Sequence, residues 1–98
     1  MTKFVLLYQG GTMPQTPAEG EKVMADWMAW FGKAGSAILD MGNAYGPATA
    51  VGASLADSGT NGYSTIDAAD AGAAKALVSD HPHLAAGGRI EIHETVEM

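Results

Sequence analysis

The sequence contains no cysteine among its 98 residues. This absence excludes disulfides, thiol catalysis and zinc sites built on cysteine ligands. A chain without cysteine also suits a reducing compartment, and we predict a cytoplasmic location.

Positive charge is scarce as well, because five lysines and arginines stand against eleven aspartates and glutamates, giving a net charge of −6. The five basic residues are isolated from one another: Lys3, Lys22, Lys33, Lys75 and Arg89. Nucleic-acid binding and adsorption to anionic membranes both need clustered basic side chains. Long apolar runs are also missing, and none approaches the roughly 20 residues that span a bilayer. We therefore expect neither nucleic acid nor a membrane as a partner.

Apolar content is high: 47% of the residues are hydrophobic and 16% are charged, which is typical of a folded chain. The length indicates a single domain, residues 1–98. A chain of this size buries about two-thirds of the surface that its unfolded form exposes. The high apolar fraction therefore leaves a surplus for contact with a partner.

Hydrophobic periodicity and turn residues divide the chain into alternating strands and helices. The predicted elements are a strand at 3–9, a helix at 17–34, a strand at 36–41, a hairpin arm near 47–60 with its turn at 57–62, a strand at 63–66, a helix at 70–79 and a strand at 89–97. This order is that of a split βαβ unit, in which two helices cover one face of an antiparallel sheet. The expected fold class is therefore α+β, ferredoxin-like.

The first helix has the clearest predicted boundaries. Thr16 is suited to cap it, Pro17 to occupy its first position and Glu19 to complete a capping box. Gly35 follows as a C-terminal stop. Aromatic residues at helical spacing are assigned to the core, with methionines as gap-fillers. The aromatic residues are Trp27, Trp30 and Phe31, and the methionines are Met13, Met24, Met28 and Met41.

The first strand is apolar on both faces. Phe4, Leu6 and Tyr8 alternate with Val5 and Leu7, so each side of the strand carries large apolar side chains. Strands of this kind are normally covered on both sides. Two helices cover one face of the predicted sheet, and the predicted elements leave no segment for the other. We therefore expect a second copy of the chain to cover that face in a homodimer.

Three histidines are candidates for acid–base catalysis. His81 and His83 flank Pro82 after the second predicted helix, and Asp80 is placed to orient one of them. Two other interpretations stay open for this pair, a loop near a helix C-terminus and a metal site. The metal interpretation lacks a third ligand, and we predict neither a metal nor another cofactor.

His93 lies on the polar face of the last predicted strand, next to Glu91 and Thr95. If that face lines the interior of a dimer, a histidine facing a carboxylate is suited to act as a base. If the face points to water, the histidine is solvated surface. The sequence leaves both interpretations open.

A loop of small and polar residues follows the second predicted strand. Asp40, Asn43 and Tyr45 supply a carboxylate, an amide and a phenol, and two glycines let the backbone approach a ligand. The loop is either the rim of a pocket or a tight turn with an Asx-type hydrogen bond. Asp40 therefore joins the three histidines as a catalytic candidate. The candidate ligand contacts are Tyr8, Asn43, Tyr45, Tyr63 and Glu91.

Four segments carry a resemblance that covers nearly the whole chain: KFVLLY at 3–8, the loop at 40–47, GYSTI at 62–66, and the stretch from HPHL to GGRIEI at 81–92. In order and spacing they resemble the YCII-related domain family. The resemblance implies a ferredoxin-like protomer that forms a dimeric α/β barrel, and a His–Asp pair in the cleft of those members proposed as enzymes. That histidine lies on the first helix of the family, and residues 17–34 contain none, so one of the three histidines here would replace it.

The sequence supports two functional hypotheses. The first is a homodimeric protein with a small-molecule ligand, whose cleft performs cofactor-free proton transfer, elimination or hydrolysis through a His–carboxylate pair. The alternative is a non-catalytic binding or regulatory dimer, in which the pocket residues only satisfy one another. A strongly shifted pKa in the cleft favours the first hypothesis.

Overall fold

The computed structural model of the chain describes residues 1–55 and 58–97. Its elements are β1 (Thr2–Gly10), α1 (Pro17–Ala34), a 3₁₀ turn η1 (Gly35–Ala37), β2 (Ile38–Asp40), β3 (Thr60–Ala68), α2 (Ala71–Val78), α3 (Pro82–Ala85) and β4 (Gly88–Glu94). The predicted α+β class is confirmed.

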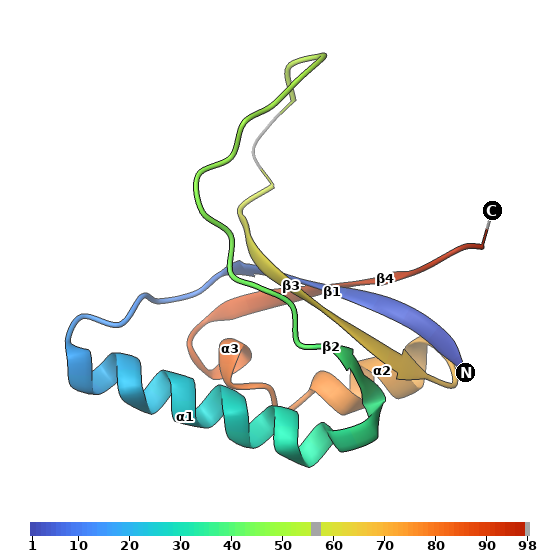
Figure 1. Cartoon of the computed structure of the whole chain (residues 1–98), viewed down its shortest axis with the longest axis horizontal. Coiled ribbons are helices and arrows are strands. Elements are labelled where there is room, and N and C mark those ends of the chain that lie inside the picture. Colours follow the sequence, from blue (N-terminus) through green and yellow to red (C-terminus); the bar gives the residue numbers. More distant parts are fainter. Residues whose placement is uncertain (56–57, 98) are drawn as a thin grey trace.

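The strands form one antiparallel sheet in the order β2-β3-β1-β4. β1 is central and pairs with β3 on one side and with β4 on the other. The three helices all lie against the same face of this sheet (Figure 1). The arrangement is compatible with the ferredoxin-like fold that the order of elements predicts.

The core lies between the sheet and the helices. It consists of buried apolar side chains from β1, α1, β3 and α2: Phe4, Leu6, Tyr8, Trp30, Ile66, Ala68, Ala74 and Val78. Trp27 and Phe31 pack against this cluster, as the helical spacing predicts. The methionines are a correction, because Met13, Met24, Met28 and Met41 are 50% to 75% exposed. They belong to the outer side of α1 and to loops, where they fill no gap.

Helix α1 begins and ends where its local signals predict. The Thr16 side chain accepts a hydrogen bond from the backbone N–H of Glu19 at 3.1 Å. The Glu19 carboxylate accepts from the N–H of Gln15 at 2.6 Å, one residue before the position that a capping box requires. Gly35 ends the helix at a positive φ of 58°. Among the described residues, no helix is long and apolar enough to cross a membrane.

The predicted hairpin arm is wrong. Within the described residues, no strand lies between β2 and β3, and the chain there is irregular. β3 begins at Thr60, so residues 60–62 of the predicted turn belong to a strand, while Asp57 lies outside the described residues. Small residues without apolar alternation supply nothing to hold two paired strands together.

Residues 46–55, which we call the arm, stand away from the sheet on the side opposite the helices (Figure 1). The base of the arm is tied to the sheet by a bridge between Ala44 and Gly62. Val51 and Leu55 in the arm are 97% and 89% exposed. The radius of gyration is 14.3 Å, above the roughly 13 Å of a compact chain of this length.

The C-terminal half differs from the prediction in two further ways. The predicted elements include no helix between 79 and 89, but Pro82 occupies the first turn of the short helix α3. β4 ends at Glu94 instead of residue 97, and Thr95 donates from its N–H to the carbonyl of Lys3 at 3.0 Å. Proline suits the first turn of a helix because its missing N–H would have no partner there.

His83 of α3 occupies a recess that is floored by glycine. Its Nε2 lies 2.9 Å from the buried carbonyl oxygen of Gln9 at the end of β1. A Cβ on Gly88 would lie 2.2 Å from this Nε2, and a Cβ on Gly11 would lie 3.0 Å from Cε1. Gly11 and Gly88 therefore make room for the imidazole ring between the end of β1 and the start of β4.

Candidate functional site

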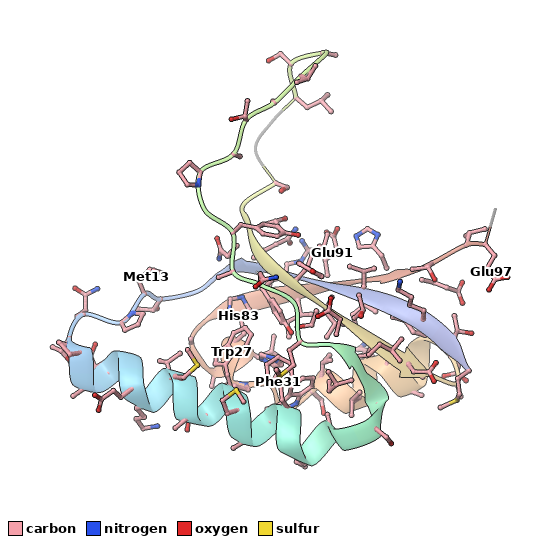
Figure 2. The ribbon with its side chains drawn as sticks, in the orientation of Figure 1. Met13, Trp27, Phe31, His83, Glu91 and Glu97 are labelled. Carbon is pink, nitrogen blue, oxygen red and sulfur yellow. The ribbon has the colours of Figure 1, made fainter. Side chains whose placement is uncertain are left out.

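The face of the sheet without helices, which we call the open face, carries polar and apolar side chains in separate columns. Strand pairing assigns its residues, since directly opposed residues of antiparallel strands point to the same side. They are Arg89, Glu91 and His93 from β4, Lys3, Val5, Leu7 and Gln9 from β1, Tyr63, Thr65 and Asp67 from β3, and Asp40 from β2. Figure 2 shows Glu91 on this side of the sheet and Trp27 and His83 on the other.

The β4 side chains of the open face form one hydrogen-bonded row. Nε2 of His93 is in short contact with Oε1 of Glu91, whose Oε2 accepts from Nη1 of Arg89 at 3.2 Å. Nη1 of Arg89 also donates to Oε1 of Gln9 at 2.6 Å. The row therefore places an imidazole, a carboxylate and a guanidinium side by side on three alternate residues.

Glu91 orients the imidazole of His93. The hydrogen bond from His93, together with the positive charge of Arg89, holds the pKa of the Glu91 carboxyl below its ordinary value. An ionised carboxylate only accepts hydrogen bonds, so Nε2 of His93 carries the proton between them. In the part of the chain that the structure describes, Nδ1 of His93 has no hydrogen-bond partner. In the neutral ring this nitrogen is an acceptor, free to take a proton from a ligand.

Asp40 and Tyr63 occupy the opposite margin of the open face. The Tyr63 hydroxyl donates to Oδ2 of Asp40 at 3.2 Å, and Oδ1 of Asp40 accepts from the N–H of Gly42 at 2.8 Å. The rings of Tyr45 and Tyr63 are stacked with their centroids 6.0 Å apart. Asn43 contributes through its backbone, whose carbonyl accepts from the N–H of Tyr63 at 3.2 Å. The loop is thus an Asx-type turn, and its Tyr45 ring stacks on Tyr63 of β3 at the margin of the open face.

Val5 and Leu7 form an apolar floor between these two polar margins. Both side chains are half-buried on the face that no helix covers. Adjacent strands lie about 4.8 Å apart, so the β3 and β4 columns are separated by about 10 Å across β1. A small planar molecule of that width would contact the floor while its polar groups reach either margin. The open face therefore combines an apolar surface with groups that bind and move protons.

The open face brings together most of the residues that the sequence singled out. The predicted candidates on it are His93, Glu91, Asp40, Tyr45 and Tyr63. Arg89 and Gln9 were not among the candidates. Both stand at every second position of their strands together with other open-face residues, so they point to the same side. Tyr8, His81 and His83 lie on the other side of the sheet, in the core.

His81 is enclosed by aromatic rings and is only 1% exposed. The ring centroids of Tyr8, Trp27 and Trp30 lie 5.1, 4.5 and 4.4 Å from its own. Nδ1 of His81 accepts from the N–H of His83 at 2.9 Å and caps α3, whereas Nε2 has no partner among the described residues. Burial lowers the pKa of His81 to about 4.

The interpretation of His81 and His83 as a loop near a helix C-terminus holds for His81, which follows the end of α2, but not for His83, which lies in α3. Pro82 starts α3, and this single helical turn directs both imidazoles toward the core. Neither ring is near the His93–Glu91 pair, because the sheet lies between them. The two rings serve packing and the capping of α3.

Tyr8 has a structural role in the core. Its buried hydroxyl donates to Oγ of Ser64 at 2.7 Å, and Ser64 donates to the carbonyl of Met41 at 2.7 Å. Burial raises the pKa of the Tyr8 phenol.

We expect Tyr8→Phe to lower the free energy of unfolding by about 1 kcal/mol. The loss is that of a single hydrogen bond, because Ser64 keeps its own bond to the carbonyl of Met41. Urea denaturation followed by tryptophan fluorescence measures this loss, and unchanged stability would contradict the structural role.

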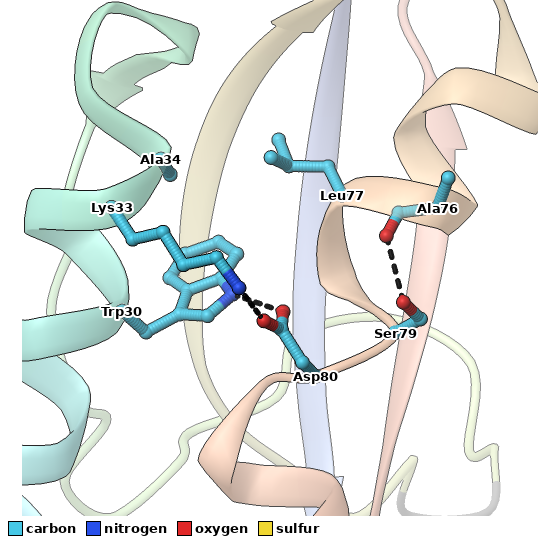
Figure 3. A pocket seen from close by; sticks show the side chains of 7 residues that line it. All are labelled: Trp30, Lys33, Ala34, Ala76, Leu77, Ser79 and Asp80. Atoms are coloured by element: carbon cyan, nitrogen blue, oxygen red, sulfur yellow. Dashed lines mark hydrogen bonds and ion pairs between the residues drawn. The ribbon is translucent and has the colours of Figure 1, made fainter.

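A hollow of about 310 Å³ lies on the helical side, between α1 and the end of α2 (Figure 3). Lys33 forms an ion pair with Asp80, which also accepts from the indole N–H of Trp30 at 3.2 Å. The hydrogen bond from Lys33 lowers the pKa of Asp80. Ser79 donates to the carbonyl of Ala76 at 2.8 Å. The polar groups of this hollow partner one another and tie α1 to the segment after α2.

No group of three or more potential metal-ligating side chains occurs among the described residues. No family model, curated protein or solved structure matches the chain. The functional assignment therefore depends on the residues of the open face themselves.

Proposed function

We propose that the chain is a homodimeric small-molecule-binding protein whose site is the open face, and that His93 acts there as a general base. The reaction is cofactor-free proton transfer, or an elimination or hydrolysis that begins with one. The observation that carries this proposal is the hydrogen-bonded row of Arg89, Glu91 and His93 beside an apolar floor.

Each group has a defined role in this proposal. Nδ1 of His93 takes the proton, while Glu91 holds the ring through Nε2 and stabilises the imidazolium that forms. Arg89 neutralises an anionic group of the ligand. Tyr63 hydrogen-bonds the far end of the ligand and, with Tyr45, offers a ring face for stacking.

Two considerations support a dimer with the open faces toward each other. The half-buried side chains of Val5 and Leu7 gain burial when a second sheet covers them. The resemblance to the YCII-related domain family implies the same arrangement, a dimeric α/β barrel. Covering the open face also removes water from the His93–Glu91 pair, which strengthens the interaction between its charges.

Proton transfer is tested by exchange of C–H hydrogens in D₂O. We expect the wild-type protein to catalyse exchange in at least one member of a panel of small carbonyl and phenolic compounds, followed by ¹H NMR. His93→Gln should slow that exchange by about 100-fold or more, because it removes the base. Glu91→Gln should slow it less, because the carboxylate acts through the ring. Glu94→Gln is the matched control on the same strand and should leave the rate unchanged.

The same NMR samples distinguish the alternative function. If ligands shift the resonances of Tyr63 and His93 without any exchange, the protein is a non-catalytic binding or regulatory dimer. That result is compatible with the mutual hydrogen bonding of Arg89, Glu91 and Gln9. If no compound shifts these resonances, the open face is not a small-molecule site and the proposal fails.

A further inference from the structure

We propose that the arm of each protomer closes over β4 of its partner and completes the partner's site beside Arg89 and Glu91. The inference rests on the proposed face-to-face homodimer and goes beyond it, because it assigns a segment of one copy to the site of the other. The occupant of the space above β4 is then the arm of a second copy of this chain.

The arm has the composition of a buried segment but is exposed in the protomer. Residues 41–56 contain no Asp, Glu, Lys, Arg or His, although 16% of the whole chain is charged. Val51 and Leu55 are almost fully exposed, and no hydrogen bond links the described residues 46–55 to the rest of the described structure. An uncharged segment with exposed apolar side chains is stabilised by a surface that covers it.

The protomer cannot use its own arm to cover β4. The arm rises at the β2–β3 margin, and β4 is the opposite edge of the sheet order β2-β3-β1-β4. A two-fold axis that lies between facing sheets and runs parallel to the strands brings the partner's β2–β3 margin over β4. The β4 edge, in turn, has no strand beyond it within the described structure.

The register of the sheet shows where along β4 the partner's arm arrives. The base of the arm bridges to β3 between Ala44 and Gly62, Gly62 lies opposite Tyr8, and Tyr8 lies opposite Ile90. Rotation about an axis parallel to the strands keeps each residue at the same height along them. The partner's arm therefore meets β4 near Ile90, between the open-face side chains of Arg89 and Glu91.

The length of the arm fits this position. Tyr45 makes the last backbone hydrogen bond of the base, to Asn61 at 2.7 Å, and Val51 is the sixth residue after Tyr45. Six extended residues span about 20 Å, whereas facing sheets lie about 10 Å apart. The arm therefore crosses the space between the sheets and runs down past the edge of the partner's sheet, with apolar side chains available to exclude water there.

Cross-linking tests the position directly, because the natural chain has no cysteine. Separately purified Val51→Cys and Arg89→Cys chains are mixed and treated with a short bis-maleimide. Lys22→Cys on α1 replaces Arg89→Cys in the control; the two native side chains are similarly exposed, 78% and 69%. We expect the 51–89 heterodimer to form at least about 10-fold faster than the 51–22 heterodimer, and equal rates would overturn the inference.

A second variant measures the contribution of the arm to association. Val51→Asp with Leu55→Asp should raise the dimer dissociation constant by about 100-fold or more in analytical ultracentrifugation. Met13→Asp with Met24→Asp is the control of comparable exposure and should leave the constant unchanged. Circular dichroism checks that each protomer stays folded.

The outcomes separate the inference from the proposed function. A wild-type dimer that keeps its affinity after the arm substitutions overturns the role of the arm and leaves the homodimer standing. A wild-type chain that is monomeric at 100 µM overturns the homodimer, and the arm inference with it.

Discussion

Lowering the pH from 7 to 4 should cost the fold about 3 kcal/mol through His81 alone. The pKa of His81 is about 4 in the folded chain and about 6.5 in the unfolded chain, and each unit of difference corresponds to about 1.4 kcal/mol. The folded state disfavours the charged ring, so the contribution of neutral His81 to the free energy of unfolding is complete above pH 6.5. It is lost as the pH falls from about 6.5 toward 4.

The low pKa of His81 is caused by the environment of its ring. Trp27, Trp30 and Tyr8 enclose it. Nδ1 accepts from the N–H of His83, so Nε2 carries the proton of the neutral ring, and a second proton on Nδ1 would face that N–H donor. His83, one residue beyond Pro82, lowers the pKa of His81 further, while the negative charge of Asp80 raises it only partly. Protonation therefore places an unpaired charge among aromatic side chains.

The measurement is the free energy of unfolding in urea at several pH values between 7 and 4.5. His81→Asn is the matched variant, because its side-chain oxygen can still accept from the N–H of His83 but cannot be protonated in this range. We expect the variant to be less stable than wild type at pH 7 and to lose much less on acidification. Parallel pH profiles for the two proteins would show that His81 does not carry the effect.

Gly42→Ala should lower the free energy of unfolding by about 3 kcal/mol or more. Gly42 has a positive φ of 74°, which costs a residue with a Cβ about 1–2 kcal/mol. The added Cβ would also lie 1.7 Å from the carbonyl oxygen of Tyr63, a backbone atom held in β3. The loop must therefore separate from β3 to accept an alanine, and that movement disturbs the turn that Asp40 closes with Gly42.

Gly87→Ala separates the cost of the positive φ from the cost of the steric clash. Gly87 has a similar positive φ of 81°, but no atom lies within 4 Å of the Cβ position. We expect it to cost only the conformational part, about 1–2 kcal/mol in the same denaturation experiment. Equal losses in the two variants would mean that the loop after β2 yields to the clash without separating from β3.

Helix α1 could be predicted almost to the residue because its ends are decided by adjacent side chains. Thr16, Pro17 and Gly35 act through atoms within four residues of themselves. β4 could be located from alternation and β1 from its run of apolar residues, and both signals likewise need only neighbouring residues. The arm could not be predicted, since its conformation in the protomer is set by the absence of any surface against it. α3 was missed because Pro82 suits both the end of one helix and the start of another.

The site was predictable to the extent that it lies within one strand. Arg89, Glu91 and His93 alternate along β4, so their common face follows from the sequence alone. Gln9 joins them only through the register between β1 and β4, which no local pattern fixes. The burial of His81 and His83 could not be predicted for a related reason. The direction of their rings depends on how the four-residue helix α3 packs against the sheet.

The recess around His83 also ties two distant positions to each other. Gly88 leaves no space for a Cβ while the imidazole is in place, and the imidazole is held there by the carbonyl of Gln9. A side chain at position 88 can be accommodated only if the side chain at position 83 becomes smaller, so we expect the residues at the two positions to change together. Homologous chains that carry a larger residue at one position should carry a smaller one at the other, and the pair could be exchanged together when the protein is redesigned.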